Sequence, residues 1–365
     1  MSQMIRTSLD ALSDLQLTLG ISRPLFVCSK RWAQRLPKGA PVFSRFDPNP
    51  DFDQCAAGTS MFQRKHCDGL IAIGGGSAMD TAKGIKAMLL SSSPTAALLG
   101  QYPGSTAFPL ICVPTTAGSG SEATQTAVLY VDGQKHSLSH PMLYAQGVIL
   151  DASLLATLPV SMKRSCALDA LCQAIESFWS NASSEESRAI AGPAMQEILR
   201  VFVPYLQGDP QAAETMLHAS YAAGQAIQLT RTTAAHAMSY QITKRIGIPH
   251  GDACALTLPY LWMRLNNDPG FAVTGTLLAD VLGVSSGDAP LLFLGLSMDT
   301  GLLPPGCPDE ELLEYLTDSV NLERLGNHPQ HLSRDDIRDV YIQALTPASE
   351  ELEAKALAVW RHHGN

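Results

Sequence analysis

Short apolar runs alternate with helical stretches over the first 150 residues of the chain. Strands that are buried on both faces of a sheet appear in a sequence as continuous apolar runs. Their alternation with helices is typical of a parallel α/β sheet. The pattern predicts five such strands, at residues 24–28, 40–43, 68–73, 108–113 and 147–151.

Two further patterns complete the expected organisation. Residues 123–131 and 135–138 can form a hairpin around Asp132-Gly133, because Asp-Gly favours a tight turn. From about Val160 the pattern becomes helical, with glycine and proline breaks near residues 208–210, 247–249 and 304–306. We therefore predict an α/β dinucleotide-binding domain over residues 1–159 and an all-α metal-binding domain over residues 160–365.

Composition narrows the class of protein. The chain has 365 residues and a formal net charge of -9. It contains no basic run, so its electrostatics give no reason to bind nucleic acid. The eight cysteines are scattered without a CxxC pair, which indicates reduced thiols in a reducing compartment. No signal-peptide pattern opens the chain and no apolar run approaches the ~20 residues of a membrane span, so we expect a cytoplasmic protein without a membrane partner.

A glycine-rich turn and a hydroxyl-rich turn follow successive predicted strands. Gly74-Gly75-Gly76-Ser77 separates a strand from the helical stretch 78–88, a context that suits a pyrophosphate. Its spacing is not GxGxxG, and an ordinary structural turn is the alternative. Thr115, Thr116 and Ser119 follow the next strand and can donate to phosphate or ribose oxygens. A helix-capping loop is the alternative there.

Carboxylate, amide and imidazole side chains recur at helical spacing in the second half of the chain. Asp169 and Gln173 are four residues apart, as are His236 and Tyr240, and His250 follows His236 by fourteen. An aspartate and two histidines can hold a divalent metal and leave a position open for substrate. Taken alone, each histidine is more often a core residue.

Four segments together resemble a known family. In order, GGGSAMDTAK, PTTAGSGSE, ALDALCQAIESFWS and AAHAMSYQITKRIGIPHG resemble the signatures of iron-containing (group III) alcohol dehydrogenases. The resemblance runs from about residue 20 to 265. It implies a Rossmann-like domain followed by an all-helical domain, the dehydroquinate synthase-like architecture, with the active site in the cleft between them. It also implies a homodimer that transfers hydride between NADH or NADPH and a small alcohol or aldehyde.

The resemblance assigns roles residue by residue. It places cofactor contacts at Gly75, Gly76, Ser77, Asp80, Thr115, Thr116, Ser119 and Lys135, and metal ligands at Asp169, His236 and His250. Two positions depart from the family pattern, because Gln173 and Tyr240 stand where histidines are usual. Gln173 ligates the metal through its amide oxygen, or the metal keeps three protein ligands and a water. Tyr240 donates a proton or shapes the pocket.

The departures resemble one branch of the family more closely. LDALCQAIESFWS and RTTAAHAMSYQIT are similar to phosphonoacetaldehyde reductases, also called hydroxyethylphosphonate dehydrogenases. Arg231, followed by Thr232 and Thr233, can form a cup for a phosphonate oxyanion, the alternative being a surface arginine. The branch implies reduction of phosphonoacetaldehyde to 2-hydroxyethylphosphonate, with the metal as Lewis acid.

The cofactor, the metal and two other functions stay open at this point. Ser29, with Lys30 and Arg31, occupies the place of an aspartate in many NAD-preferring relatives, so we expect NADPH to be accepted alongside NADH. The sequence leaves Fe²⁺ and Zn²⁺ as metals. The alternatives are a broad-range alcohol dehydrogenase and, because of the missing histidine, a metal-free nucleotide-binding protein without catalysis. Dehydroquinate synthase and glycerol dehydrogenases share the architecture, but their motifs are further away.

Overall fold

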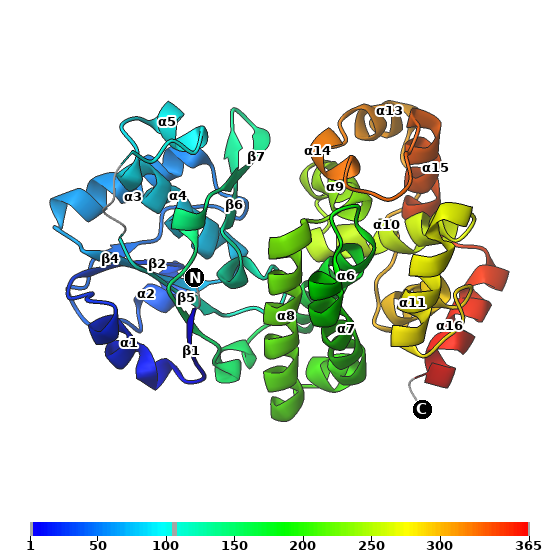
Figure 1. The fold of residues 1–365 in the computed structure, drawn as a ribbon, viewed down its shortest axis with the longest axis horizontal. Coiled ribbons are helices and arrows are strands. Elements are labelled where there is room, and N and C mark those ends of the chain that lie inside the picture. Colours follow the sequence, from blue (N-terminus) through cyan, green and yellow to red (C-terminus); the bar gives the residue numbers. More distant parts are fainter. Residues whose placement is uncertain (1–2, 104–107, 364–365) are drawn as a thin grey trace. The chain divides into compact units, whose positions relative to one another are not determined.

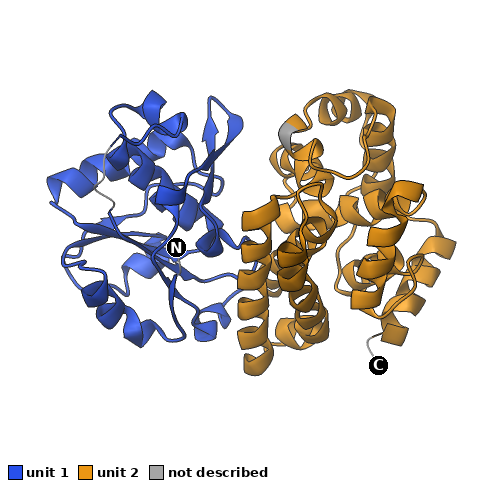
Figure 2. Ribbon diagram, viewed as in Figure 1, with its two compact units in different colours: residues 1–158 blue, residues 159–365 orange. Residues whose placement is uncertain are grey.

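The structure is a computed structural model that describes residues 3–103 and 108–363, apart from the side chain of Glu323. The chain divides into two compact units, residues 1–158 (unit 1) and residues 159–365 (unit 2) (Figure 2).

Unit 1 contains strands, helices and short 3₁₀ turns. The elements are β1 (Met4–Arg6), η1 (Leu9–Ala11), α1 (Leu12–Thr18), β2 (Pro24–Cys28), α2 (Lys30–Ala33), β3 (Val42–Phe43), α3 (Phe52–Arg64), β4 (Gly69–Gly74), α4 (Gly76–Leu90), α5 (Pro94–Leu98), β5 (Leu110–Pro114), η2 (Ser121–Ala123), β6 (Thr126–Val131), β7 (Gln134–Ser139), η3 (Pro141–Leu143), β8 (Gly147–Ile149) and η4 (Ala152–Leu155).

Six strands form one parallel sheet in the order β1-β8-β5-β4-β2-β3. The central strands β2, β4 and β5 are almost fully buried, which explains their unbroken apolar sequences. One face of the sheet packs on the apolar residues of α1 and α2. Figure 1 shows α1 on one side of the sheet and α3 and α4 on the other. This is the Rossmann-like arrangement that the sequence predicts.

The five predicted strands are confirmed as β2, β3, β4, β5 and β8. The hairpin is confirmed as well: β6 and β7 pair antiparallel, and Asp132 and Gly133 both have positive φ, at 49° and 73°. Two left-handed residues are what a two-residue hairpin turn requires. Strand β1 was missed, because its three residues lie at the sheet edge, are largely exposed and form no apolar run.

In the described residues of unit 2, all regular secondary structure is helical. Its elements are α6 (Val160–Trp179), α7 (Glu185–Leu206), α8 (Pro210–Thr230), α9 (Ala234–Gln241), the π-helix η5 (Ile242–Ile246), α10 (His250–Leu265), η6 (Pro269–Phe271), α11 (Ala272–Leu282), α12 (Ala289–Asp299), α13 (Glu310–Asp318), α14 (Leu322–Leu325), α15 (Arg334–Leu345) and α16 (Glu350–His363). The predicted all-α fold of this half of the chain is confirmed.

Helix α6 is the centre of unit 2. It contacts α7, α8 and α10, and every residue from Ala167 to Trp179 is buried. A helix in that position must be apolar on most of its circumference, so any charged residue on it needs a partner. Asp169 on α6 belongs to the candidate metal centre, and Gln173 and Glu176 on the same helix bond its members.

No helix in the described part of the chain has the length and apolarity to cross a membrane. All eight cysteines are free thiols, and six of them are buried.

Candidate functional site

The glycine-rich turn and the hydroxyl-rich turn of unit 1 lie against each other. They follow β4 and β5, which are neighbours in the sheet, with Gly74 opposite Pro114. A Cβ atom at Gly75 would lie 3.1 Å from Thr116 Oγ1, and one at Gly76 would lie 3.0 Å from Ser119 Oγ. The absence of side chains therefore allows the close approach of the two turns. Helix α4 begins at this point, so its unpaired N–H groups and partial positive charge are available there for a phosphate.

Asp80 and Lys135 lie near each other beside this turn. The Asp80 carboxylate accepts hydrogen bonds from Ser121 Oγ (2.7 Å) and the backbone N–H of Val128 (3.1 Å). Burial raises the pKa of Asp80, and the charges of Lys83 and Lys135 act against that rise. Asp80 thus fastens the hairpin to α4, and the positive charge of Lys135, on β7, acts on its carboxylate.

Ser29 and Ser77 lie at the same edge of the sheet. Ser29 is exposed and precedes α2, directly after β2, which is the neighbour of β4. Ser77 is in the first turn of α4, and its Oγ accepts a hydrogen bond from the backbone N–H of Asn49 (3.3 Å). The structure therefore gathers the predicted cofactor residues beyond the carboxyl ends of β2, β4 and β5 and along α4 and β7, where open α/β sheets bind ligands.

The candidate metal centre is a buried cluster in unit 2. One ligand atom each from Asp169, His236, His250 and Cys254 lies within 4.8 Å of the others, and no second such group of His, Cys, Asp or Glu occurs in the described residues. The Asp169 Oδ1 atom is 3.2 Å from His236 Nε2. The sequence predicted the first three residues. It missed Cys254, although its position one turn after His250 on a helix is a readable signal.

Gly251 explains how the helices that carry these side chains can meet. It follows His250 in the first turn of α10, which packs on α6. A Cβ atom at Gly251 would lie 1.9 Å from the Ser165 carbonyl oxygen and 2.9 Å from Asp169 Cβ. Any larger residue would push α10 away from α6 and separate His250 from Asp169.

A buried carboxylate orients His236. Glu176 lies two turns after Asp169 on α6, and its Oε2 bonds His236 Nδ1. Its Oε1 accepts the backbone N–H groups of Thr233 and Ala235, so Glu176 also caps the start of α9. With Nδ1 bonded to Glu176, Nε2 is the His236 atom that faces the cluster. Such a carboxylate behind a histidine is typical of metal sites. Glu176 was not predicted from the sequence, although its spacing from Asp169 puts it on the same helix face.

His250 is oriented in a similar way. Its Nδ1 lies 3.2 Å from Ser239 Oγ, and that hydroxyl donates to the His236 carbonyl oxygen (2.8 Å). The hydroxyl oxygen is therefore placed to accept the Nδ1 proton, which leaves Nε2 as a ligand atom. That Nε2 lies 3.9 Å from Cys254 Sγ. The Tyr240 ring stacks on the His250 ring, with centroids 5.9 Å apart and planes inclined by 22°.

The electrostatics of the cluster suit a cation. Burial raises the pKa of Asp169, but the hydrogen bond from His236 and the charges of His236 and His250 outweigh it and hold that pKa below its usual value. Burial lowers the pKa of His236, yet the charges of Cys254 and Glu176 raise it well above its usual value. Burial raises the pKa of Cys254, and the two histidines more than reverse that rise. The donor set of carboxylate, imidazoles and thiolate fits a divalent transition metal.

Gln173 and Arg231 occupy different environments. Gln173 is buried one turn after Asp169, and its side-chain hydrogen bond helps lower the Asp169 pKa.

Arg231 is exposed at the end of α8, with φ at 63° and ψ at 178°. The predicted cup of Arg231 with two hydroxyls needs a correction. The Thr233 hydroxyl donates to Glu176 (2.7 Å) and accepts from Trp179 Nε1 (3.1 Å), so it is committed inside the protein.

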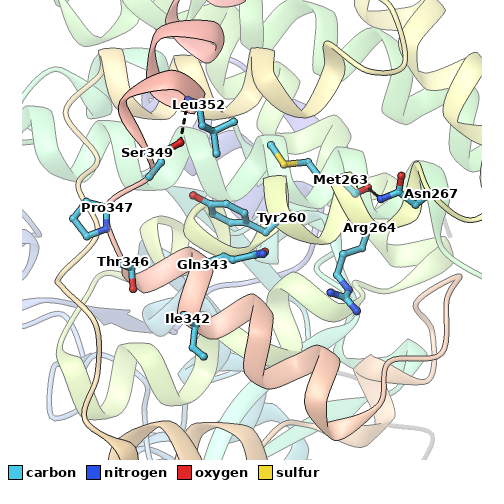
Figure 3. A pocket seen from close by; sticks show the side chains of 11 residues that line it. Tyr260, Met263, Arg264, Asn267, Ile342, Gln343, Thr346, Pro347, Ser349 and Leu352 are labelled. Carbon is cyan, nitrogen blue, oxygen red and sulfur yellow. Dashed lines mark hydrogen bonds between the residues drawn. The ribbon is translucent and has the colours of Figure 1, made fainter.

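A separate pocket of about 510 Å³ lies at the other end of α10 (Figure 3). Residues from α10 and from the α15–α16 segment line it, among them Tyr260, Met263 and Thr346. At 1.5 Å per helical residue, Met263 is about 14 Å along the axis from Cys254. This pocket is therefore distinct from the metal centre.

Comparisons with known proteins agree with these features. The family model of iron-containing alcohol dehydrogenase matches residues 5–152, and that of the Fe-containing alcohol dehydrogenase C-terminal region matches residues 164–345. The chain is 30% identical over 334 residues to phosphonoacetaldehyde reductase of Streptomyces viridochromogenes. The aligned residues cover 84% of this chain and 84% of that one. The chain is 29% identical over 315 residues, 81% of each chain, to sulfoacetaldehyde reductase of Bilophila wadsworthia.

A solved structure adds the fold. The crystal structure of sulfoacetaldehyde reductase from Bifidobacterium kashiwanohense in complex with NAD+ matches with a TM-score of 0.85 and 29% identity, over 94% of this chain and 98% of that one. The predicted family, architecture and enzyme class are confirmed. This chain belongs to the iron-containing alcohol dehydrogenase family and is an oxidoreductase of the alcohol dehydrogenase and aldehyde reductase type.

Proposed function

We propose that the protein reduces phosphonoacetaldehyde to 2-hydroxyethylphosphonate with NADPH or NADH. The observation that carries the proposal is the buried cation-binding cluster of Asp169, His236 and His250, in a chain that is 30% identical to a phosphonoacetaldehyde reductase. The structure of a sulfoacetaldehyde reductase relative holds NAD+, which supports a nicotinamide cofactor. A homodimeric, cytoplasmic enzyme stays a prediction from the sequence.

The chain's own residues have defined tasks in this reaction. The turns around Gly75–Gly76 and Thr115–Ser119 bind the pyrophosphate and nicotinamide side of the cofactor. Asp169, His236 and His250 would hold a divalent metal, which would supply a Lewis acid for the carbonyl oxygen when bound. Glu176 keeps His236 in the tautomer that leaves Nε2 unprotonated. The alcohol proton comes from solvent or through Tyr240, whose ring stacks on His250.

Arg231 binds the phosphonate in this proposal. A guanidinium is suited to a tetrahedral oxyanion because it donates in a planar fork. The backbone of Arg231 is left-handed, a conformation that costs a residue other than glycine about 1–3 kcal/mol and that is concentrated at functional sites. Asn327 Nδ2 donates to the carbonyl oxygens of Thr230 (2.8 Å) and Thr232 (3.1 Å), which fixes the segment around Arg231.

The proposal is tested by NADPH consumption with phosphonoacetaldehyde, with propionaldehyde as an uncharged substrate of similar size, and after treatment with a chelator. Turnover that is fast, chelator-sensitive and restricted to the phosphonate supports it. Comparable turnover of both aldehydes overturns the substrate assignment and indicates a broad-range alcohol dehydrogenase. Cofactor binding without bound metal or turnover indicates a nucleotide-binding protein without catalysis.

Three variants isolate the role of Arg231. An ion-paired hydrogen bond contributes about 1.5–3 kcal/mol, so Arg231→Ala should lower kcat/KM for the phosphonate by about 10–100-fold and leave propionaldehyde unchanged. Arg231→Lys should recover part of the loss. Arg231→Gly relieves the backbone strain and should fold at least as stably as the wild type while losing phosphonate selectivity. An equal effect of Arg231→Ala on both aldehydes rules out the anion role.

Sulfoacetaldehyde is a second candidate substrate, favoured by two relatives that are sulfoacetaldehyde reductases. A sulfonate has the same tetrahedral shape as a phosphonate and carries one negative charge, whereas a phosphonate approaches two near neutral pH. The ratio of kcat/KM values for the two aldehydes decides between them, because the two substrates differ mainly in the second negative charge of the phosphonate.

A further inference from the structure

The cluster in unit 2 contains a fourth donor that takes the place of the missing histidine. Cys254 is fully buried on α10, one turn after His250. Its Sγ belongs to the group of ligand atoms that lie within 4.8 Å of one another. A thiol here is surrounded by imidazole and carboxylate groups, where a buried cysteine in a core would have apolar neighbours.

The four ligand atoms lie close enough together to surround one metal ion. Zinc bonds of about 2.0–2.3 Å place neighbouring ligand atoms about 3.3–3.6 Å apart in a tetrahedron. Two of the six edges between the ligand atoms are 3.2 Å, from Asp169 Oδ1 to His236 Nε2, and 3.9 Å, from Cys254 Sγ to His250 Nε2, and no edge exceeds 4.8 Å. The longer edge involves sulfur, as its larger bond length requires.

Gln173 has a different task at this centre. Its side chain hydrogen-bonds the Asp169 carboxylate. An ionised carboxylate only accepts, so the Gln173 amide nitrogen is the donor in that bond. Gln173 thereby orients Asp169, while the histidine that relatives place at this position would ligate the metal directly.

We propose that the Cys254 thiolate is the fourth protein ligand, in a set with Asp169, His236 and His250 to which a substrate oxygen would add as a fifth ligand, and that this set selects Zn²⁺ over Fe²⁺. Two anionic and two neutral donors balance the charge of a divalent ion. Thiolate is a soft ligand, and a mixed sulfur, nitrogen and oxygen set suits zinc. Metal binding replaces the thiol proton, which is released to water. The inference rests on the proposed function, because it concerns the metal centre of the same enzyme.

Cobalt substitution tests the ligand directly, without an activity assay. The full-length protein is stripped of metal, loaded with Co²⁺ and examined for a sulfur-to-cobalt charge-transfer band in the near ultraviolet, with bound cobalt counted per chain. The wild type should bind one cobalt and show the band. Cys254→Ala should lose the band and bind cobalt about tenfold more weakly or worse. Cys172→Ala, which removes another fully buried thiol, on α6, should keep both.

The outcomes distinguish a wrong assignment of Cys254 from the absence of a metal centre. If the wild type binds one cobalt per chain without the band, or if the band survives Cys254→Ala, Cys254 is not a ligand. The metal centre then remains, with Gln173 or water as the fourth ligand. No cobalt binding by the wild type overturns the metal centre itself, and with it the proposed function.

A compensating variant tests the claim should Cys254→Ala fold poorly. Gln173→His combined with Cys254→Ala restores a donor set of one carboxylate and three imidazoles. It should bind one cobalt without the sulfur band. In anaerobic competition between Zn²⁺ and Fe²⁺, its preference for zinc should be about tenfold lower than that of the wild type. An unchanged zinc preference overturns the proposed selection.

Discussion

Unit 1 builds its candidate site from backbone, whereas unit 2 builds its candidate site from buried charged side chains. In unit 1, Gly75 and Gly76 bring a helix N-terminus against Thr116 and Ser119, where an added Cβ would lie only 3.0–3.1 Å from their side chains. In unit 2, the ligand side chains are held by hydrogen bonds to groups such as Glu176, whose carboxylate accepts from His236. The first arrangement depends on the shape of the chain and the second on its charges.

This difference determines which changes each site tolerates. A conservative change that keeps shape and removes charge should spare unit 1 and damage unit 2. A change that adds one methyl group without charge should do the opposite at the glycine turn. Such matched changes test whether the site in unit 1 depends on shape and the site in unit 2 on charge.

The largest effect is expected for Glu176→Gln. The two side chains have nearly the same shape, but the glutamine amide directs N–H groups or a neutral oxygen at His236 Nδ1. If Nδ1 becomes the acceptor, Nε2 carries the proton and can no longer bind a metal. We expect metal affinity and turnover to fall by about 100-fold, the upper end for groups behind metal ligands.

The measurement is metal retained per chain after dialysis against a weak chelator. Glu186→Gln, on the exposed start of α7, is the matched control and should retain metal like the wild type. Cofactor affinity should be unchanged in both. Full metal retention in Glu176→Gln would contradict the role given to the buried carboxylate.

The next largest effect is expected for Gly76→Ala in unit 1. Its Cβ would lie 3.0 Å from Ser119 Oγ and 3.1 Å from Ser119 Cβ, so the Ser119 side chain or the turn must move by a few tenths of an ångström. A steric cost of about 2 kcal/mol corresponds to about 30-fold weaker NADPH binding, measured by fluorescence titration. Gly287→Ala is the control, because the nearest atom to its added Cβ is 3.9 Å away. Metal content should be normal in both, and unaltered NADPH affinity in Gly76→Ala would contradict the shape argument.

The sequence predicts the parts of these sites that depend on local pattern. Buried parallel strands give apolar runs, and a glycine turn between a strand and a helix is visible without a structure. Asp169, His236 and His250 became candidates through helical spacing and a family resemblance. Each of these signals lies within a few neighbouring residues or a fixed motif.

The missed residues depend on packing between distant segments. Glu176 is 60 residues from His236 in the chain, and only the meeting of α6 with α9 shows that the two bond. Cys254 becomes a candidate ligand because Gly251 lets α10 approach α6. The Thr233 hydroxyl was assigned to substrate because its bonds to Glu176 and Trp179 cannot be read from its own segment.

A smaller effect is expected for Ser29→Asp, which tests the charge of unit 1 away from the glycine turn. Ser29 is exposed directly after β2, followed by Lys30. An added carboxylate repels a 2′-phosphate and can accept hydrogen bonds from a free ribose. We expect kcat/KM with NADPH to fall by about tenfold, or about 1.4 kcal/mol, while NADH is kept. Ser13→Asp adds the same charge at an exposed site of α1 and should leave the ratio unchanged. An unchanged ratio in Ser29→Asp would refute the assignment.

The smallest effect is expected for Tyr240→Phe, which separates the two roles open to this residue. The ring stacks on His250, and phenylalanine keeps that ring while removing the hydroxyl. If Tyr240 mainly holds the His250 imidazole in place, kcat should fall by less than about threefold, because the aromatic contact of about 0.5–1.5 kcal/mol is kept. Tyr240→Leu removes that contact and should weaken metal retention. If the hydroxyl donates the alcohol proton, Tyr240→Phe should instead cost about 10²–10⁴-fold in kcat, with normal metal content and an altered pH profile. Comparing kcat and bound metal between Tyr240→Phe and Tyr240→Leu therefore shows whether Tyr240 positions His250 or donates the alcohol proton.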